Sequence, residues 1–306
     1  MRNISRSPDD SRQESPDTLL SMVEQQMSEL VAPERASTRR SSLETGPSKV
    51  AEAAAYHLQT GGQRMRVKLC IHAGLALGLS TATIVCLGAA CELIHNASLI
   101  HDDIQDRDMY RRGKKTVWAL YGESVAICAG DLYLSAAYVS LANVDRPELI
   151  GKLIRKIHER VAHVIQGQSA DLALKDILFN DIGLYEQIVV AKSGALIGLP
   201  LELCLISAQM SEWLPKTASV VEPFSIGYQI LDDLNDLKED AASDLKQRSL
   251  NAILVLEQKH RSGDPVMAAR YLARQKFQEA ATSAGMLPRN LGRQFAELAR
   301  HLADQV

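Results

Sequence analysis

Aromatic residues and surplus charge are what this sequence has least of. Phe, Trp and Tyr make up 5% of the 306 residues, too few for a surface that binds single-stranded nucleic acid by base stacking. The 34 Lys and Arg nearly balance the 37 Asp and Glu, for a net charge of −3. Because phosphate neutralisation needs a clustered excess of cations, the composition excludes a nucleic-acid-binding protein that relies on a bulk cationic surface.

Cysteines with disulfide or metal-ligand spacing are also absent. Single cysteines occur within apolar segments, at Cys70, Cys86, Cys91, Cys128 and Cys204. A free cysteine in such a segment behaves as a small buried hydrophobic residue. We therefore expect a reducing, cytoplasmic location, with neither disulfides nor zinc.

Long uncharged apolar runs are missing as well. The longest apolar stretch, near Gln187–Ala208, is interrupted by Lys192 and Glu202, whereas a membrane-spanning helix needs about 20 largely uncharged residues. We expect a soluble protein without a membrane span. Its 46% of apolar residues is enough to fill one large core or two modest ones.

The first 48 residues differ in composition from the rest. They are rich in Ser, Arg, Asp, Glu and Pro, and such segments bury too little apolar area to offset the entropy lost on ordering. Within them, the apolar spacing over Asp17–Val31 predicts one amphipathic helix with Asp17 as its N-cap. We predict that residues 1–48 form a flexible polar tail with this short docking helix, and that residues 49–306 form a single domain.

The domain has a helical pattern throughout. Segments rich in Ala, Leu, Ile, Glu and Lys alternate with Gly, Pro and Asp breaks, without strand signatures or internal repeats. The pattern predicts an all-α fold, a large bundle of mostly antiparallel helices. The predicted helices span about 48–60, 64–78, 82–104, 122–142, 146–172, 182–208, 216–238, 246–260, 264–284 and 288–304.

Two acidic clusters follow apolar helices. The first contains Asp102, Asp103, Asp106 and Asp108, and the second, 130 residues later, contains Asp232, Asp233 and Asp236. Carboxylates at i and i+4 share one helix face, and Mg²⁺ takes such ligands together with substrate phosphate oxygens. An acidic helix end in solvent is the simpler explanation for one cluster, but two such clusters favour a shared metal site.

Basic residues accompany the acidic clusters. Arg111, Arg112, Lys114 and Lys115 follow the first cluster, and Gly61–Arg66 begins a helix with two glycines whose backbone N–H groups can approach an anion. Arg side chains bind diphosphate oxygens in pairs. No nucleophile elbow, HExxH or P-loop is present. The residues therefore indicate a magnesium-dependent reaction of a diphosphate ester, in which metal ions stabilise the leaving group.

These motifs together resemble the trans-isoprenyl diphosphate synthases (polyprenyl synthetases) over about residues 47–256. GGQRMR (Gly61–Arg66) is similar to the family's GGKRxR, His95 lies seven residues before Asp102, and DDIQD is followed by RRG. The remaining motifs occur in the family's order: Gly130-Asp131, Gln168 with Asp171, Lys192-Ser193-Gly194, and Gln229 before DDLND.

The resemblance implies an isoprenoid synthase fold around a deep cavity, a homodimer, a trinuclear Mg²⁺ cluster and head-to-tail 1'-4 condensation. By analogy, the metal ligands are Asp102, Asp106 and Asp232, with Asp103, Asp233 and Asp236 completing the motifs. The allylic diphosphate is held by Arg111, Lys192 and Lys238, and isopentenyl diphosphate by Gln63, Arg66, His95 and Arg112. Ser193 and Gln229 lie near the allylic cation that ionisation produces.

The sequence departs from the family pattern at three places. Gln63 replaces the usual Lys, Val67 replaces the usual Pro, and the loop after the second motif is reduced to LKEDAASDLKQRSLNA, in which Lys246 or Arg248 could replace the missing lysines. We expect these changes to weaken isopentenyl diphosphate binding and to leave the metal site intact.

Product length in this family depends on the residues just before the first acidic motif. Here they are the small Ala97 and Ser98, with Ile94 and Ala90 further down the helix. Small residues let the growing chain pass, so the resemblance implies geranylgeranyl diphosphate or longer, with farnesyl diphosphate as the nearest alternative. Ordinary tight helix packing also accounts for small residues here.

Two other functions stay open. A class I terpene cyclase also ionises an allylic diphosphate, but its second metal motif is normally an Asn/Ser/Glu pattern. A non-catalytic subunit of a heteromeric prenyl synthase commonly loses its aspartates, whereas both clusters are intact here.

Overall fold

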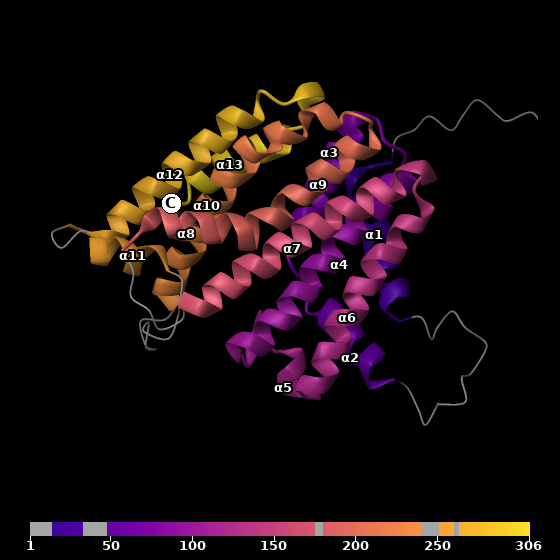
Figure 1. Cartoon of the computed structure of the whole chain (residues 1–306), viewed down its shortest axis with the longest axis horizontal. Helices are drawn as coiled ribbons and strands as arrows, with labels where there is room; N and C mark the ends of the chain where they lie inside the picture. The colour runs from indigo at the N-terminus through magenta and orange to yellow at the C-terminus, as the bar shows by residue number, and fades with distance from the viewer. Residues whose placement is uncertain (1–13, 33–47, 175–179, 240–250, 260–262) are drawn as a thin grey trace, which may run out of the picture.

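The computed structural model describes residues 14–32, 48–174, 180–239, 251–259 and 263–306 (Figure 1). Helix α9 (Ala195–Ser207) lies at its centre and is buried over its whole length. It contacts α3 (Met65–Leu77), α4 (Thr81–Asp106), α7 (Ile150–Leu174) and α10 (Leu214–Glu239). The all-α prediction is confirmed.

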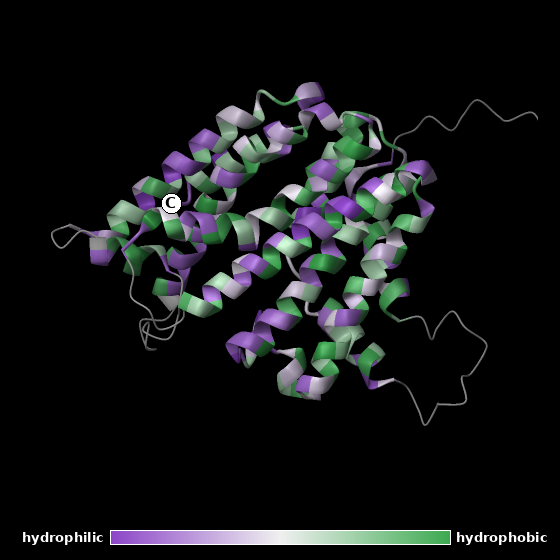
Figure 2. Ribbon diagram, in the orientation of Figure 1, coloured by the Kyte–Doolittle hydropathy of each residue, from purple (hydrophilic) through white to green (hydrophobic). Residues whose placement is uncertain are grey.

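Other helices surround these. Helices α2 (Lys49–Gln59) and α6 (Glu123–Ser140) pack together beside α4, and α12 (Pro265–Ala284) packs between α10 and α13 (Arg293–Ala303). In Figure 2, hydrophilic and hydrophobic residues alternate along α7 and α12, as expected for helices with one buried face. Among the described residues, four short turns of 3₁₀ helix connect the longer elements, at Leu141–Asn143, Pro147–Leu149, Ser211–Trp213 and Pro288–Asn290.

The helix predictions hold apart from three local features. The sequence did not indicate the two-residue strands β1 (Tyr110–Arg111) and β2 (Lys114–Lys115), which pair antiparallel, or the short helix α5 (Val117–Tyr121). The helix predicted over 182–208 is divided into α8 (Ile182–Val189) and α9 by a π-helical turn, η4 (Val190–Gly194). Helix α11 (Ala252–Lys259) falls in the predicted 246–260 range, whose first residues lie outside the described part.

Helix α1 (Pro16–Val31) is part of the hydrophobic core. Its buried residues, Leu19, Val23, Met27 and Val31, are fully inaccessible, and the helix packs on α3, α4 and α6. The amphipathic helix predicted here is confirmed, but its N-cap is Ser15, whose hydroxyl accepts from the Thr18 N–H, and not Asp17. The polar segments on either side, 1–13 and 33–47, lie outside the described residues.

Three stretches of helix are long and apolar enough to cross a membrane, by length and composition alone: Thr81–Asp106, Glu123–Asn143 and Ile182–Ser207. In the first and third, 83% and 78% of the apolar window is buried inside the protein, so core packing accounts for their apolar character. In Glu123–Asn143 the buried share is 44%, which leaves one face of α6 exposed.

All five cysteines are free thiols, and four of them are buried. The expected burial is wrong for Cys128, which lies on the outward face of α6 beside the exposed Ile127.

Candidate active site

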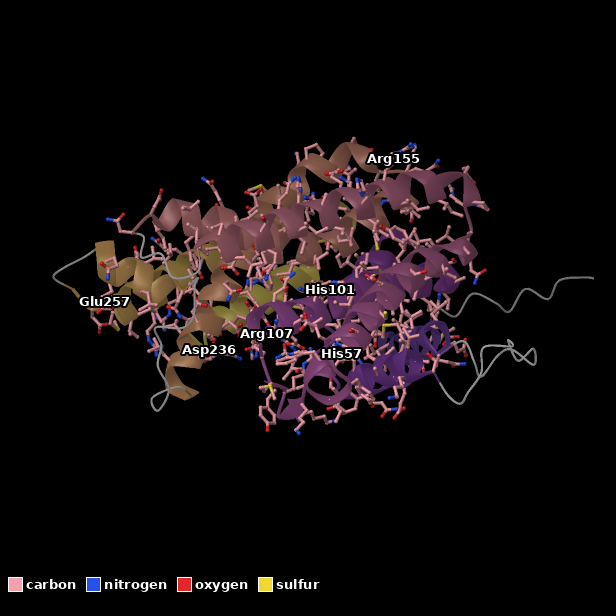
Figure 3. All side chains as sticks on the ribbon, turned by 60° about the horizontal axis from the view of Figure 1, so that its bottom comes forward. His57, His101, Arg107, Arg155, Asp236 and Glu257 are labelled. Carbon is pink, nitrogen blue, oxygen red and sulfur yellow. The ribbon has the colours of Figure 1, made fainter. Side chains whose placement is uncertain are left out.

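The two acidic clusters meet across one polar cavity of about 620 Å³. Asp102 and Asp106 come from the last turns of α4, and Asp232 comes from α10. Figure 3 marks these two regions by Arg107, which follows α4, and by Asp236 of α10. Eight other residues predicted for the site line the same cavity: Gln63, Arg66, His95, Arg111, Arg112, Lys192, Ser193 and Gln229.

Burial dominates the electrostatics of the first cluster. It raises the pKa of Asp102 to about 6, and Asp106 and Asp103 add to the rise while Lys192 and Arg111 oppose it. A positive charge entering the cavity would therefore keep Asp102 ionised.

Asp103 lies behind the cavity rather than on its wall. It is 1% exposed, and its Oδ1 accepts from Nε of Arg111 at 2.7 Å and lies 2.7 Å from Nη2 of the same guanidinium. The structure therefore places Asp103 as the group that orients Arg111.

The second cluster divides in the same way. Asp233 is 3% exposed and accepts three hydrogen bonds, from the Tyr185 hydroxyl at 2.8 Å, the Ala252 N–H at 2.7 Å and Gln229 Nε2 at 3.1 Å. Burial raises its pKa to about 6 against the effect of these donors. Asp233 thus joins α8, α10 and α11, and the half-buried Asp236 is not among the residues that line the cavity.

The π-helical turn η4 places Lys192 and Ser193 on the cavity wall. Lys192 Nζ donates to Asp171 Oδ2 of α7 at 2.8 Å. Burial lowers the pKa of Lys192, but Asp102, Asp171 and Asp106 raise it by more, so the net shift is upward and the amine stays charged. A Cβ on Gly167 would lie 2.7 Å from the backbone nitrogen of Lys192, so only glycine lets α7 approach this turn so closely.

The Gly61–Gly62 loop and Arg112 lie against each other and form a basic wall of the cavity. Gly62 has a φ of +142°, and a Cβ there would lie 2.8 Å from the Arg112 guanidinium. Arg112 also donates to the Gly61 carbonyl oxygen. Burial, together with Arg66 and Arg112, lowers the pKa of His95 well below its ordinary value, so His95 is neutral and carries one donor and one acceptor nitrogen.

An apolar cavity of about 360 Å³ begins at Asp102, which lines both cavities. The three residues predicted to control product length, Ile94, Ala97 and Ser98, all line it. The sequence did not indicate the apolar residues that other helices contribute, which are Leu134, Val161, Val164, Ile165, Leu172 and Leu196. Helical periodicity identifies the buried face of a helix but not the helix that it faces.

Several other outcomes concern the predicted residues. Lys238 lies in α10, but its side chain, like Lys246 and Arg248, lies outside the described part. The sequence analysis missed three residues that line the polar cavity, Arg64, Glu92 and Tyr228. Arg64 could have been found, because it belongs to the GGQRMR segment.

The side chains that line the cavity suit metal ions that are shared with a ligand. Within the described ranges, no three or more His, Cys, Asp or Glu side chains lie close enough together to hold one ion between them. Asp102 and Asp106 of α4 and Asp232 of α10 present carboxylates to the cavity, the hard ligands that Mg²⁺ prefers. This arrangement fits ions bound between the protein and an anionic ligand, because Mg²⁺ commonly takes only one or two protein carboxylates.

Several known proteins are similar to this chain in sequence. A family model described as Polyprenyl synthetase matches residues 47–282. A geranylgeranyl pyrophosphate synthase from Geoglobus acetivorans is 31% identical over 220 residues, which cover 69% of this chain and 69% of that protein. A (2E,6E)-farnesyl diphosphate synthase from Mycobacterium bovis is 34% identical over 176 residues, 56% of this chain and 48% of that protein.

Solved structures share the fold. The geranylgeranyl pyrophosphate synthetase of Geoglobus acetivorans superposes with a TM-score of 0.77 at 26% identity, covering 95% of this chain and 100% of that one. A decaprenyl diphosphate synthase from Rhodobacter capsulatus gives a TM-score of 0.78 at 21% identity, covering 95% and 99%. At that identity the likeness shows the fold alone.

Proposed function

Because this chain belongs to the polyprenyl synthetase family, we propose that it is a prenyltransferase that condenses isopentenyl diphosphate with an allylic diphosphate, head to tail (1'-4), giving a trans-polyprenyl diphosphate. One observation carries the proposal. Carboxylates from two helices and a wall of cations face one polar cavity, and this cavity continues at Asp102 into an apolar one. The diphosphate of a prenyl diphosphate fits the polar cavity, and its hydrocarbon tail fits the apolar one.

Asp102, Asp106 and Asp232 would hold Mg²⁺, three ions by family resemblance. When bound, the ions supply positive charge that stabilises the departing diphosphate. The placement of these carboxylates, from two different helices, in one cavity supports this assignment.

The cations divide between two substrates. Arg111, held by Asp103, and Lys192, held by Asp171, bind the allylic diphosphate beside Asp102. Arg66, Arg112 and neutral His95 bind isopentenyl diphosphate on the basic wall, and Gln63 lines the same cavity. Lys238 stays a proposed ligand of the allylic diphosphate on the resemblance alone.

The reaction begins when the allylic C1–O bond breaks and its electron pair leaves with the diphosphate. Ser193 and Gln229, whose side-chain oxygens lie 3.5 Å apart, present oxygen atoms toward the resulting cation. The double bond of isopentenyl diphosphate then attacks C1, and the released diphosphate accepts the proton that is lost to restore a double bond. Atoms and charge balance, and no residue is consumed.

The apolar cavity supports a product of geranylgeranyl length or longer. Ala97 and Ser98 place no bulky side chain at its entrance, and Ile94 lies further down α4. Farnesyl diphosphate is the nearest alternative, since relatives of both kinds are similar to this chain.

A homodimer is the assembly that we propose, in keeping with the family resemblance. Large apolar side chains are exposed on neighbouring helices, with Ile127 and Val139 on α6 and Ile165 on α7. These side chains are available for burial against a second copy of the chain. Light scattering of the purified protein measures the assembly, and a monomer at micromolar concentration would contradict it.

A product profile tests the proposed function. The purified protein receives Mg²⁺, labelled isopentenyl diphosphate and, in turn, dimethylallyl, geranyl, farnesyl and geranylgeranyl diphosphate. We expect a ladder of labelled products whose longest member reports the capacity of the apolar cavity. Conversion of the allylic substrate to a hydrocarbon or alcohol without label would replace the proposal by a terpene cyclase. Turnover only after mixing with another subunit would replace it by a heteromeric enzyme.

A further inference from the structure

Arg64 is a buried cation that connects four parts of the chain. Its side chain is 8% exposed, and it lies directly before α3 with a left-handed backbone, φ +52°. The guanidinium donates to Glu24 Oε1 of α1 at 3.1 Å, Glu92 Oε1 of α4 at 3.3 Å, the Leu58 carbonyl at 3.3 Å and the Gly61 carbonyl at 3.4 Å. An arginine that is desolvated in this way depends on its partners for orientation.

The Gly61 carbonyl oxygen links Arg64 to the proposed isopentenyl diphosphate site. The same oxygen accepts from Arg112, and the Arg112 guanidinium also lies against Gly62. Arg66 follows Arg64 by two residues and lines the same cavity. A change in the orientation of Arg64 therefore moves the loop on which both Arg112 and Arg66 depend.

Glu24 is the part of this network that lies outside residues 47–282, the range that the family model matches. Nε of Arg64 has a single hydrogen, and this hydrogen goes to Glu24. The other carboxylate, Glu92, is buried, interacts electrostatically with Arg66 and Arg112 as well, and has one oxygen without a hydrogen-bond partner. Without Glu24, Glu92 would be the one carboxylate paired with Arg64, while it also balances Arg66 and Arg112.

We propose that Glu24, on the amino-terminal helix α1, is a positioning residue for the binding of isopentenyl diphosphate. It acts through Arg64, which holds the Gly61–Gln63 loop and with it Arg112. Helix α1 then helps to position the residues that bind the substrate. The proposal rests on the proposed function, because that function assigns this wall to isopentenyl diphosphate.

Three variants of Glu24 test the proposal in the full-length chain: Glu24→Ala, Glu24→Gln and Glu24→Asp. Glu29→Ala is the matched control, because Glu29 lies on the same helix, is exposed and bonds only locally to Gln25. We expect Glu24→Ala to raise the KM for isopentenyl diphosphate about tenfold, since small displacements of a binding group have effects of this order. The kcat and the KM for the allylic substrate should change less than about twofold, the pattern of a lost ground-state contact.

The conservative variants and a second readout separate positioning from general destabilisation. Glu24→Asp should recover part of the lost affinity, and Glu24→Gln should resemble Glu24→Ala because it lacks the charge. Amide hydrogen exchange across residues 60–66 should accelerate in Glu24→Ala but not in Glu29→Ala. Equal rises in both substrate KM values, or an unchanged isopentenyl diphosphate KM, would overturn the proposal.

The proposed function can fail separately. Calorimetry with isopentenyl diphosphate alone measures its binding without turnover. A wild-type protein that neither binds nor condenses this substrate refutes the proposed function and, with it, the role of Glu24. If the wild type is active and Glu24→Ala leaves the KM for isopentenyl diphosphate unchanged, only the role of Glu24 is refuted.

Discussion

Removing the hydroxyl of Tyr185 should destabilise the protein in a way that depends on pH. Tyr185 is fully buried, and its hydroxyl donates at 2.8 Å to Asp233, which is also buried. A hydrogen bond to a charged group contributes about 2 kcal/mol to stability. Tyr185→Phe should therefore lower the free energy of unfolding by about 2 kcal/mol at pH 8, where Asp233 is ionised.

The sign of the pH effect follows from Asp233. Its pKa is raised from 3.8 to about 6, so between these values the folded chain binds more protons than the unfolded chain. Stability from this group therefore increases as the pH falls through 6. At pH 5 the neutral carboxyl no longer needs three donors, so the loss caused by Tyr185→Phe should shrink to 1 kcal/mol or less, roughly the value of a neutral hydrogen bond.

Tyr133→Phe is the matched control. Tyr133 is equally buried, but its hydroxyl donates to the Ala54 carbonyl at 2.9 Å, an acceptor that does not titrate. Its loss should be about 1 kcal/mol at both pH values. Urea unfolding of the three proteins at pH 5 and pH 8 measures all of these terms. A Tyr185→Phe loss that is the same at both pH values would refute the reasoning about Asp233.

The other predictions concern activity. Asp102→Ala should raise the activation free energy by roughly 3 kcal/mol, and so lower kcat/KM about 100-fold, because a metal contact is lost. Near-normal turnover in a steady-state assay would contradict the role of Asp102. Ala97→Phe should shorten the longest product seen by chromatography, and an unchanged product would place the cavity floor elsewhere. Gln63→Lys should lower the KM for isopentenyl diphosphate more than that for the allylic substrate, and a change in neither would remove Gln63 from the site.

The meeting of the two acidic clusters could be predicted, because two pairs of carboxylates at i and i+4 on apolar helices favour a shared metal site. The different positions of the aspartates within each cluster could not be predicted. Asp102 and Asp103 are neighbours in sequence, yet one lines the cavity and the other is buried against Arg111. That difference depends on which neighbour each helix face meets, and this is a property of tertiary packing.

The packing of the amino-terminal helix α1 also could not be predicted from the sequence. Apolar spacing correctly predicts helix α1, but it does not reveal that the apolar face of this helix enters the main core. Its pairing with Arg64 joins residues 40 positions apart, which no local pattern reports. The hairpin at Tyr110–Lys115 was missed because each strand has only two residues, too few for an alternation to be recognised.

The π-helical turn at Val190–Gly194 has a consequence for how the site and the fold relate. Such a turn is equivalent to one extra residue in an otherwise regular helix. Without it, α8 and α9 could continue as one rod and keep both of their buried faces. The extra residue is therefore dispensable for the architecture, and its effect is local: it presents Lys192 and the adjacent Ser193 on the same wall. A lineage could acquire or lose this arrangement by a single-codon insertion or deletion while the surrounding bundle stays the same.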